Sequence, residues 1–206
     1  MNQKILITGM QRSGTTMLRR MFHYHPDVEF MLHEKHSLTK KGENFKLLLG
    51  DFNCGEKNPY WRACQYTRPY MIEYAKKWQA TFKCHKIIHI VRHPVSVAES
   101  NKKKSKTRPK DSIEYWKNDV KPVANFISEQ EYGLNISFEN LVSDQMYFQK
   151  VLDFCGLDSS SHVVDKIYNT DYRYFDKIEP QRSLDFTEDY SGIDYNSFKN
   201  EYCLKI

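Results

Sequence analysis

Along this chain, apolar residues recur at the spacings that are typical of strands and of helices. Short runs rich in β-branched residues predict buried strands, and longer amphipathic stretches predict helices. The expected strands cover about residues 4–9, 84–91 and 135–138, with a strand or turn near 28–33. The expected helices cover about residues 14–24, 64–80, 95–103, 112–130, 144–155 and 159–168. Residues 37–62 are rich in loop-forming residues, and no helix or strand is predicted for the polar tail from about residue 176.

This order of elements predicts the fold class. Strands that alternate with helices form βαβ units, which indicate an α/β fold with three layers, a central parallel sheet flanked by helices. The 206 residues contain no internal repeat and no long Pro, Gly or Ser linker, so we expect a single domain over residues 1–206. Ligands of such folds bind at the carboxyl ends of the strands, so the loops that follow the strands are where a site is expected.

Composition narrows the class of protein. Apolar residues make up 40% of the chain and aromatic residues 14%, which is enough for a packed core and excludes global disorder. No apolar run approaches the roughly 18 residues of a membrane span. The first residues lack the features of a signal peptide, and the five cysteines show no metal-ligand spacing. We therefore expect a cytoplasmic protein with reduced thiols, no membrane span and no bound metal.

The charge pattern favours an anionic partner. The formal net charge is +5, and the densest basic segment spans residues 102–110. This segment is either a solvated loop or helix end, or a docking site for a phosphate or a sulfated chain. A nucleic-acid-binding module would carry a broader basic stripe interleaved with aromatic residues, so no nucleic-acid partner is expected.

The loop after the first strand has the residues of a phosphate-binding loop. Residues 9–16 have the pattern G-x-x-x-x-G-T-T and lead into the first expected helix. Its glycines let the backbone wrap around an anion, and free amides at the start of the helix point toward that anion. The hydroxyls of Ser13, Thr15 and Thr16 add hydrogen-bond donors. Loops that bind triphosphates have a lysine where this chain has Thr15, whereas the basic residue here is Arg12, which favours a shorter anion.

A second anion site is expected after the buried strand at residues 84–91. Arg92 supplies a fixed charge at the end of this strand, and Pro94 opens the following helix. Ser100 follows eight residues after Arg92, slightly more than two helical turns further on.

Both loops resemble those of sulfotransferases that use 3′-phosphoadenosine 5′-phosphosulfate (PAPS). Residues 11–16, continuing to 25–28, look like the 5′-phosphosulfate loop of that family. Arg92 and Ser100 look like its 3′-phosphate motif, and the second phosphate of the cofactor accounts for the second anion site.

A third segment extends the resemblance to about residues 4–157. Residues 136–157 are similar to the family's Y-E-D-L … F-L-G-L pattern, with Phe138 and Asn140 as departures. Glu139 in this segment is interpreted as a carboxylate that braces the fold. The resemblance implies a P-loop-like sulfotransferase domain with PAPS as cofactor, adenosine 3′,5′-bisphosphate as its product, and no metal. The implied cofactor-binding residues are Arg12, Ser13, Gly14, Thr15, Thr16, Arg92 and Ser100.

The loop after the first helix contains the implied catalytic base. Its sequence His-Glu-Lys-His looks like the acidic-residue-x-His pattern of heparan-type glycan sulfotransferases, which makes Glu34 the base and His36 its helper. The register of this loop leaves His33 open as an alternative base. A solvated charged loop is the other interpretation.

Lys57 lies in a segment that resembles the family's E-K-x-x-x-Y pattern. Together with Arg12 it is implied to neutralise the negative charge that develops near the bridging oxygen, and an ordinary surface lysine is the alternative. Tyr60 and Trp61 are either a stacking wall for a sugar or phenol, or part of the core.

The expected function is therefore transfer of a sulfuryl group from PAPS to an acceptor hydroxyl. A glycan acceptor is favoured, and a tyrosine side chain or a small alcohol remains open. Two other hypotheses are a sulfotransferase-like module that binds a nucleotide or sulfated ligand without turnover, and a P-loop nucleotide kinase. The tail lacks the family's basic Gly-rich lid pattern, which motivates the first, and the missing lysine at Thr15 argues against the second.

Overall fold

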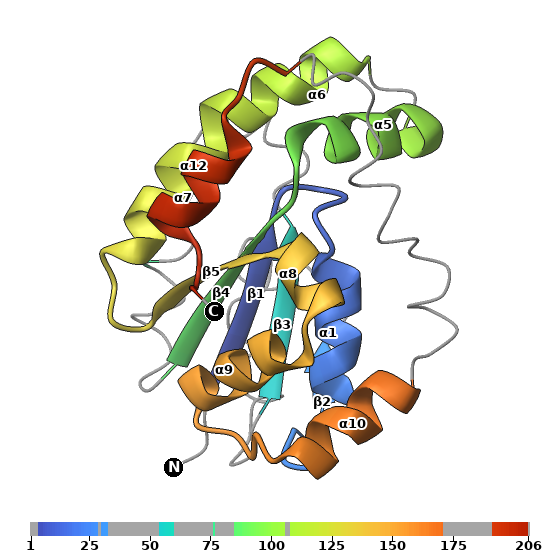
Figure 1. Cartoon of the computed structure of the whole chain (residues 1–206), viewed down its shortest axis with the longest axis vertical. Helices are drawn as coiled ribbons and strands as arrows, with labels where there is room; N and C mark the ends of the chain where they lie inside the picture. Colours follow the sequence, from blue (N-terminus) through green and yellow to red (C-terminus); the bar gives the residue numbers. More distant parts are fainter. Residues whose placement is uncertain are drawn as a thin grey trace, which may run out of the picture.

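The computed structural model describes residues 4–28, 30–32, 54–59, 76, 85–105, 108–170 and 191–205. Within this part of the chain, five strands form one sheet in the order β2-β3-β1-β4-β5, and every neighbouring pair is parallel (Figure 1). The strands are β1 (Lys4–Gly9), β2 (Phe30–Leu32), β3 (Cys54–Pro59), β4 (His85–Val91) and β5 (Gly133–Ser137).

Helices cover both faces of this sheet. They are α1 (Thr15–His23), α5 (Pro94–Ser105), α6 (Pro109–Tyr115), the π-helix η1 (Trp116–Val120), α7 (Lys121–Ser128), α8 (Phe138–Ser143), α9 (Gln145–Cys155), α10 (Ser161–Thr170) and α12 (Tyr195–Tyr202). Among the described residues, no helix has the length and apolarity needed to cross a membrane.

The core has two parts because alternate residues of a strand point to opposite faces of the sheet. Ile5 and Ile7 of β1 are buried with side chains from α1, α8, α9 and α10. Leu6, between them, is buried with side chains from η1, α7 and α12 on the other face. This arrangement confirms the predicted three-layer α/β fold with a central parallel sheet.

The structure also corrects two expectations. Cys54–Pro59 was expected to be loop because Gly55 and Pro59 are typical of turns, yet it forms β3 and pairs with β1 on one side and β2 on the other. Phe138 was expected to end a strand, but it begins α8, because the Ser137 hydroxyl caps that helix by accepting from the Asn140 amide.

One expected helix differs from the structure in extent. The helix expected over 112–130 begins earlier, at Pro109, and contains the π-helical segment η1 before it continues as α7. The helix expected over 64–80 lies outside the described residues, apart from residue 76. In the tail without an expected element, α12 begins after Asp194, whose carboxylate accepts from the Ser197 amide.

Candidate functional site

The loop between β1 and α1 is shaped by glycines that no other residue can replace without displacing a neighbour. A Cβ on Gly9 would lie 2.5 Å from the Ile90 carbonyl oxygen, and a Cβ on Gly14 would lie 2.3 Å from the Phe138 ring. Gly14 also has φ +104°, which side chains rarely permit. The backbone of this loop is therefore wrapped tightly against β4 and α8.

The start of α1 has features that suit an anion. Gly14 occupies the N-cap position and brings no side chain to accept from the first amides, and the first turn contains no acidic residue. These amides carry partial positive charge that favours a negatively charged ligand. Ser13 has another task, because its buried hydroxyl donates to the Met10 carbonyl at 2.6 Å and so closes the loop on itself.

Arg92 directly follows β4, at the position where the second anion site was predicted. Its guanidinium lies over the Phe138 ring, 4.3 Å from the ring centroid, and its Nη1 donates to the Arg12 carbonyl at 3.4 Å. The backbone of Arg92 is held from another side, because the indole N–H of Trp116 donates to the Arg92 carbonyl at 3.0 Å.

The two predicted loops come together directly. Arg12 Nε donates to Ser100 Oγ at 2.9 Å, which joins residues 88 positions apart in the sequence. The reason is the pairing of β1 with β4, in which Thr8 stands opposite His89, so that the loops after both strands leave the sheet side by side. Arg12, which has φ +75°, contributes its guanidinium and its carbonyl to this junction.

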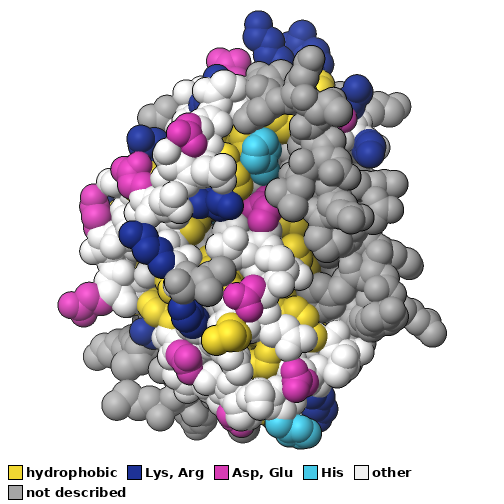
Figure 2. All heavy atoms as spheres, viewed as in Figure 1, with side chains coloured by type: hydrophobic (Ala, Val, Ile, Leu, Met, Phe, Trp, Pro, Cys, Tyr) yellow, Lys and Arg dark blue, Asp and Glu magenta, His cyan; other side chains and the backbone are white. Residues whose placement is uncertain are grey.

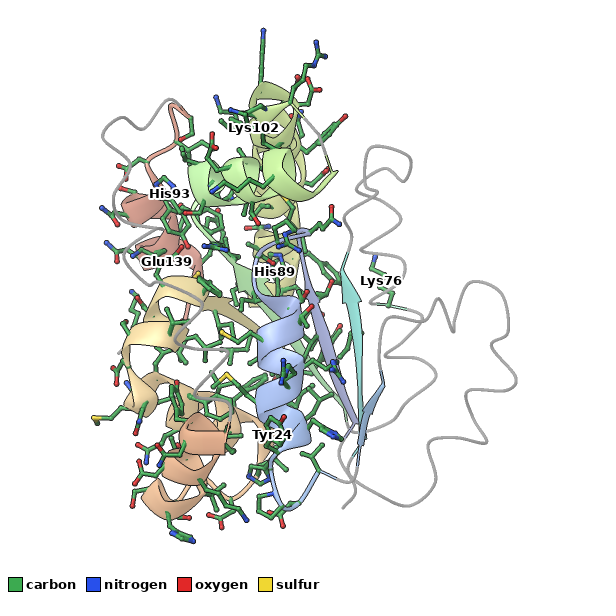
Figure 3. All side chains as sticks on the ribbon, turned by 90° about the vertical axis from the view of Figure 1, so that its right-hand side faces the viewer. Tyr24, Lys76, His89, His93, Lys102 and Glu139 are labelled. Carbon is green, nitrogen blue, oxygen red and sulfur yellow. The ribbon has the colours of Figure 1, made fainter. Side chains whose placement is uncertain are left out.

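Beside the junction lies a buried carboxylate that sequence analysis interpreted as structural. Glu139 accepts hydrogen bonds from the His93 amide at 2.9 Å, the Ser137 hydroxyl at 3.0 Å and the Tyr195 hydroxyl at 2.6 Å. Figure 3 shows Glu139 and His93 next to each other. These bonds fit the bracing role. The sequence pattern points to neither Tyr195 nor Trp116, since a hydrogen bond between distant segments leaves no signal in the local pattern.

A row of polar side chains crosses the sheet where the loops begin. Thr8, His89 and Asn135 are opposite one another on β1, β4 and β5, and all three are buried. His89 Nδ1 lies 2.8 Å from Asn135 Oδ1, and burial lowers the pKa of His89 to about 4. His89 is therefore neutral at physiological pH.

Some predicted residues lie outside the described part of the chain. These include Glu34, His36 and the alternative base His33. Lys57 is described by its backbone alone, which places it in β3 opposite Ile7 of β1. The acceptor side of the site therefore stays a prediction.

The basic segment lies at the end of α5 and the start of α6. Lys102 and Lys103 are exposed, and Figure 2 shows Lys and Arg side chains gathered at this end of the molecule. Arg108 is engaged by Asp111 through two hydrogen bonds of 3.0 and 3.1 Å. A cavity of about 800 Å³ lies nearby and is lined by Pro109, Lys110, Ile113, Glu114, Lys117 and Ser191.

Comparisons with known proteins agree on the fold. Residues 4–47 match the sequence model of a family described as "Sulfotransferase family". The sulfotransferase domain from the Synechococcus PCC 7002 olefin synthase is similar with a TM-score of 0.71 and 16% identity, over 100% of this chain and 96% of that chain. Mouse sulfotransferase SULT7A1 complexed with PAP is similar with a TM-score of 0.61 and 17% identity, over 85% of this chain and 65% of that chain. No curated protein matches the chain in sequence. The chain therefore has the fold of sulfotransferase domains.

Proposed function

We propose that this protein is a sulfotransferase that moves a sulfuryl group from PAPS to an acceptor hydroxyl and releases adenosine 3′,5′-bisphosphate. The observation that carries the proposal is the junction of two anion-binding loops, in which Arg12 contacts Ser100 and Arg92 contacts the Arg12 carbonyl. The family match over residues 4–47 includes the first loop, and the similar mouse sulfotransferase is described as a complex with PAP.

The residues at the junction fit a ligand with two separated phosphates. The tight backbone around Gly14 and the first amides of α1, which no side chain caps, suit the 5′-phosphosulfate. Arg92 and Ser100 suit the 3′-phosphate, because a guanidinium and a hydroxyl are both phosphate donors. A triphosphate fits less well, because Thr15 stands where triphosphate-binding loops have a lysine.

When bound, PAPS supplies the sulfuryl group, and the chain supplies the base and the cations. The acceptor oxygen forms its bond to sulfur while the bond from sulfur to the bridging phosphate oxygen breaks, and Glu34, assisted by His36, takes the acceptor proton. Arg12 and Lys57 stabilise the negative charge on the departing phosphate. The backbone position of Lys57 supports this role, because Lys57 lies in β3, the neighbour of β1, two residues before β3 ends.

The proposed acceptor is a glycan, and an anionic one in particular. The pattern at Glu34 and His36 resembles that of heparan-type enzymes. The exposed Lys102 and Lys103 add positive charge for an anionic chain, and the cavity near the start of α6 contains two further lysines. A tyrosine peptide and a small alcohol are the alternatives that an acceptor panel distinguishes.

The variants Arg12→Ala and Arg92→Ala test the proposal. Each should weaken binding of adenosine 3′,5′-bisphosphate by about tenfold or more, because each removes a charged hydrogen-bond donor to a phosphate. Each should also slow transfer of labelled sulfuryl groups from PAPS to desulfated heparan, a tyrosine peptide or a small alcohol. Arg108→Ala is the matched control for the bisphosphate titration, since its guanidinium is exposed and pairs with Asp111. The proposal is wrong if both loop variants bind the bisphosphate as tightly as the control does.

A further inference from the structure

The peptide unit between Arg92 and His93 is held at both of its polar atoms by side chains from other elements. Its carbonyl oxygen, from Arg92, accepts from the indole N–H of Trp116 at 3.0 Å. Its N–H, from His93, donates to Glu139 Oε1 at 2.9 Å. A peptide unit is planar, so these two hydrogen bonds fix the plane that leads out of Arg92.

One residue of the C-terminal helix touches both of these holding groups. The Tyr195 hydroxyl donates to Glu139 Oε2 at 2.6 Å, on the carboxylate that holds the His93 amide. The Tyr195 ring lies edge-on to Trp116, with 6.2 Å between the ring centroids. It also lies edge-on to the His93 ring, with 5.0 Å between the ring centroids, so Tyr195 contacts His93 itself as well as both holding groups.

The π-helical turn helps to bring these groups together. Trp116 is the first residue of η1, which interrupts the helix formed by α6 and α7. Such turns inside α-helices are frequent at functional sites. Trp116 is buried and packs edge-on against Tyr195 and Phe198 of α12, while its indole N–H donates to the Arg92 carbonyl just after β4.

We propose that Tyr195 is a positioning residue that sets the direction of the Arg92 guanidinium toward the 3′-phosphate of the bound nucleotide. This inference rests on the proposed function. Tyr195 touches no ligand in this account and acts through Glu139 and Trp116, which fix the peptide unit from which the Arg92 side chain departs. With this peptide unit fixed, the Arg92 guanidinium lies over the Phe138 ring and donates to the Arg12 carbonyl.

The Tyr195 hydroxyl keeps its proton, and so its hydrogen bond to Glu139, at every physiological pH. Burial and the neighbouring Glu139 raise the pKa of the Tyr195 phenol well above its ordinary value. The hydroxyl therefore remains protonated and donates to Glu139 over the whole physiological pH range.

A role in positioning differs measurably from a role in packing. Tyr195→Phe removes the hydroxyl and keeps the ring, so the aromatic contacts of α12 remain. Binding of adenosine 3′,5′-bisphosphate should weaken by about threefold to tenfold, the range that one hydrogen bond contributes. Binding of adenosine 5′-monophosphate should not change, because that ligand has no 3′-phosphate for Arg92 to contact. A packing defect would change both affinities alike.

Two further variants complete the test. Tyr202→Phe makes the same change on the same helix at a residue that packs on Phe198 and not on Glu139, and it should leave both affinities unchanged. Trp116→Phe removes the other hydrogen bond to the same peptide unit. It should also weaken binding of the bisphosphate and not of the monophosphate, and it replaces Tyr195→Phe in the test if that variant does not fold. Thermal unfolding of each variant reports whether it is folded at the titration temperature.

The results separate this inference from the proposed function. If the unchanged protein binds the bisphosphate and the folded variants lose affinity for it selectively, Tyr195 is a positioning residue. If the unchanged protein binds it and the folded variants do so equally well, or lose both ligands in parallel, this inference alone is overturned. If the unchanged protein does not bind the bisphosphate, the proposed function is overturned, and this inference with it.

Discussion

His89 is a buried histidine whose surroundings keep it neutral. Asn135 Nδ2 donates to the Ala124 carbonyl at 2.8 Å, so Asn135 Oδ1 is the acceptor and His89 Nδ1 carries the proton between them. Burial lowers the pKa of His89 from 6.5 to about 4, and the bond to Asn135 opposes this in part. The imidazole therefore acts as a neutral link between β4 and β5, below the two loops.

This pKa makes the stability of the protein depend on pH. Between pH 6.5 and about 4, the unfolded chain binds a proton at His89 and the folded chain does not, so the free energy of unfolding falls as the pH falls. The total loss is on the order of 3 kcal/mol. His89→Gln should show a flatter pH dependence in denaturant unfolding between pH 7 and pH 4.5. The exposed His162→Gln should keep the full slope, and equal slopes in both variants would contradict the assignment.

At the scale of elements, the start of α1 depends on the absence of a side chain at Gly14. An alanine there would be strained by the positive φ, and its Cβ would overlap the Phe138 ring. Gly192 offers a matched comparison, since it also has positive φ but its added Cβ would meet, among the described residues, only Lys117 Nζ, at 3.9 Å.

Gly14→Ala should lower the free energy of unfolding by about 2–4 kcal/mol, the sum of backbone strain and overpacking. It should also abolish measurable binding of adenosine 3′,5′-bisphosphate, because the loop backbone must move away from α8. Gly192→Ala should cost about 1 kcal/mol and leave binding intact. Denaturant unfolding and titration of both variants provide the test, and similar losses in the two would contradict the role given to the Phe138 contact.

Elements with strong local patterns were predictable, and elements formed by distant contacts were not. The β-branched run of β4 identifies a buried strand from the sequence alone. β3 shows no such pattern, because its glycine and proline are typical of loops and its strand character comes from its two neighbours. The apolar side of α12 consists of Tyr195, Phe198 and Tyr202, whose helical spacing is hard to recognise in a polar, tyrosine-rich tail.

At the scale of the whole molecule, strand order assembles the site. β1 and β4 are neighbours in the sheet, which brings Arg12 to Ser100 and Arg92 to the loop before α1. The sequence predicts both loops because each follows its own strand with the required residue types. It does not predict that Glu139, Trp116 and Tyr195 converge behind Arg92, because their distances depend on the packing of four separate elements.

The central claim is that the two loops together bind one nucleotide with phosphates at its 3′ and 5′ positions. Calorimetric titration of the protein with adenosine 3′,5′-bisphosphate, beside ADP and ATP with magnesium, tests it most directly. The bisphosphate should bind at least about tenfold more tightly than ADP, because its 3′-phosphate meets a charged donor. Preference for ATP with magnesium would contradict the account in favour of a nucleotide kinase, and absence of bisphosphate binding would contradict it outright.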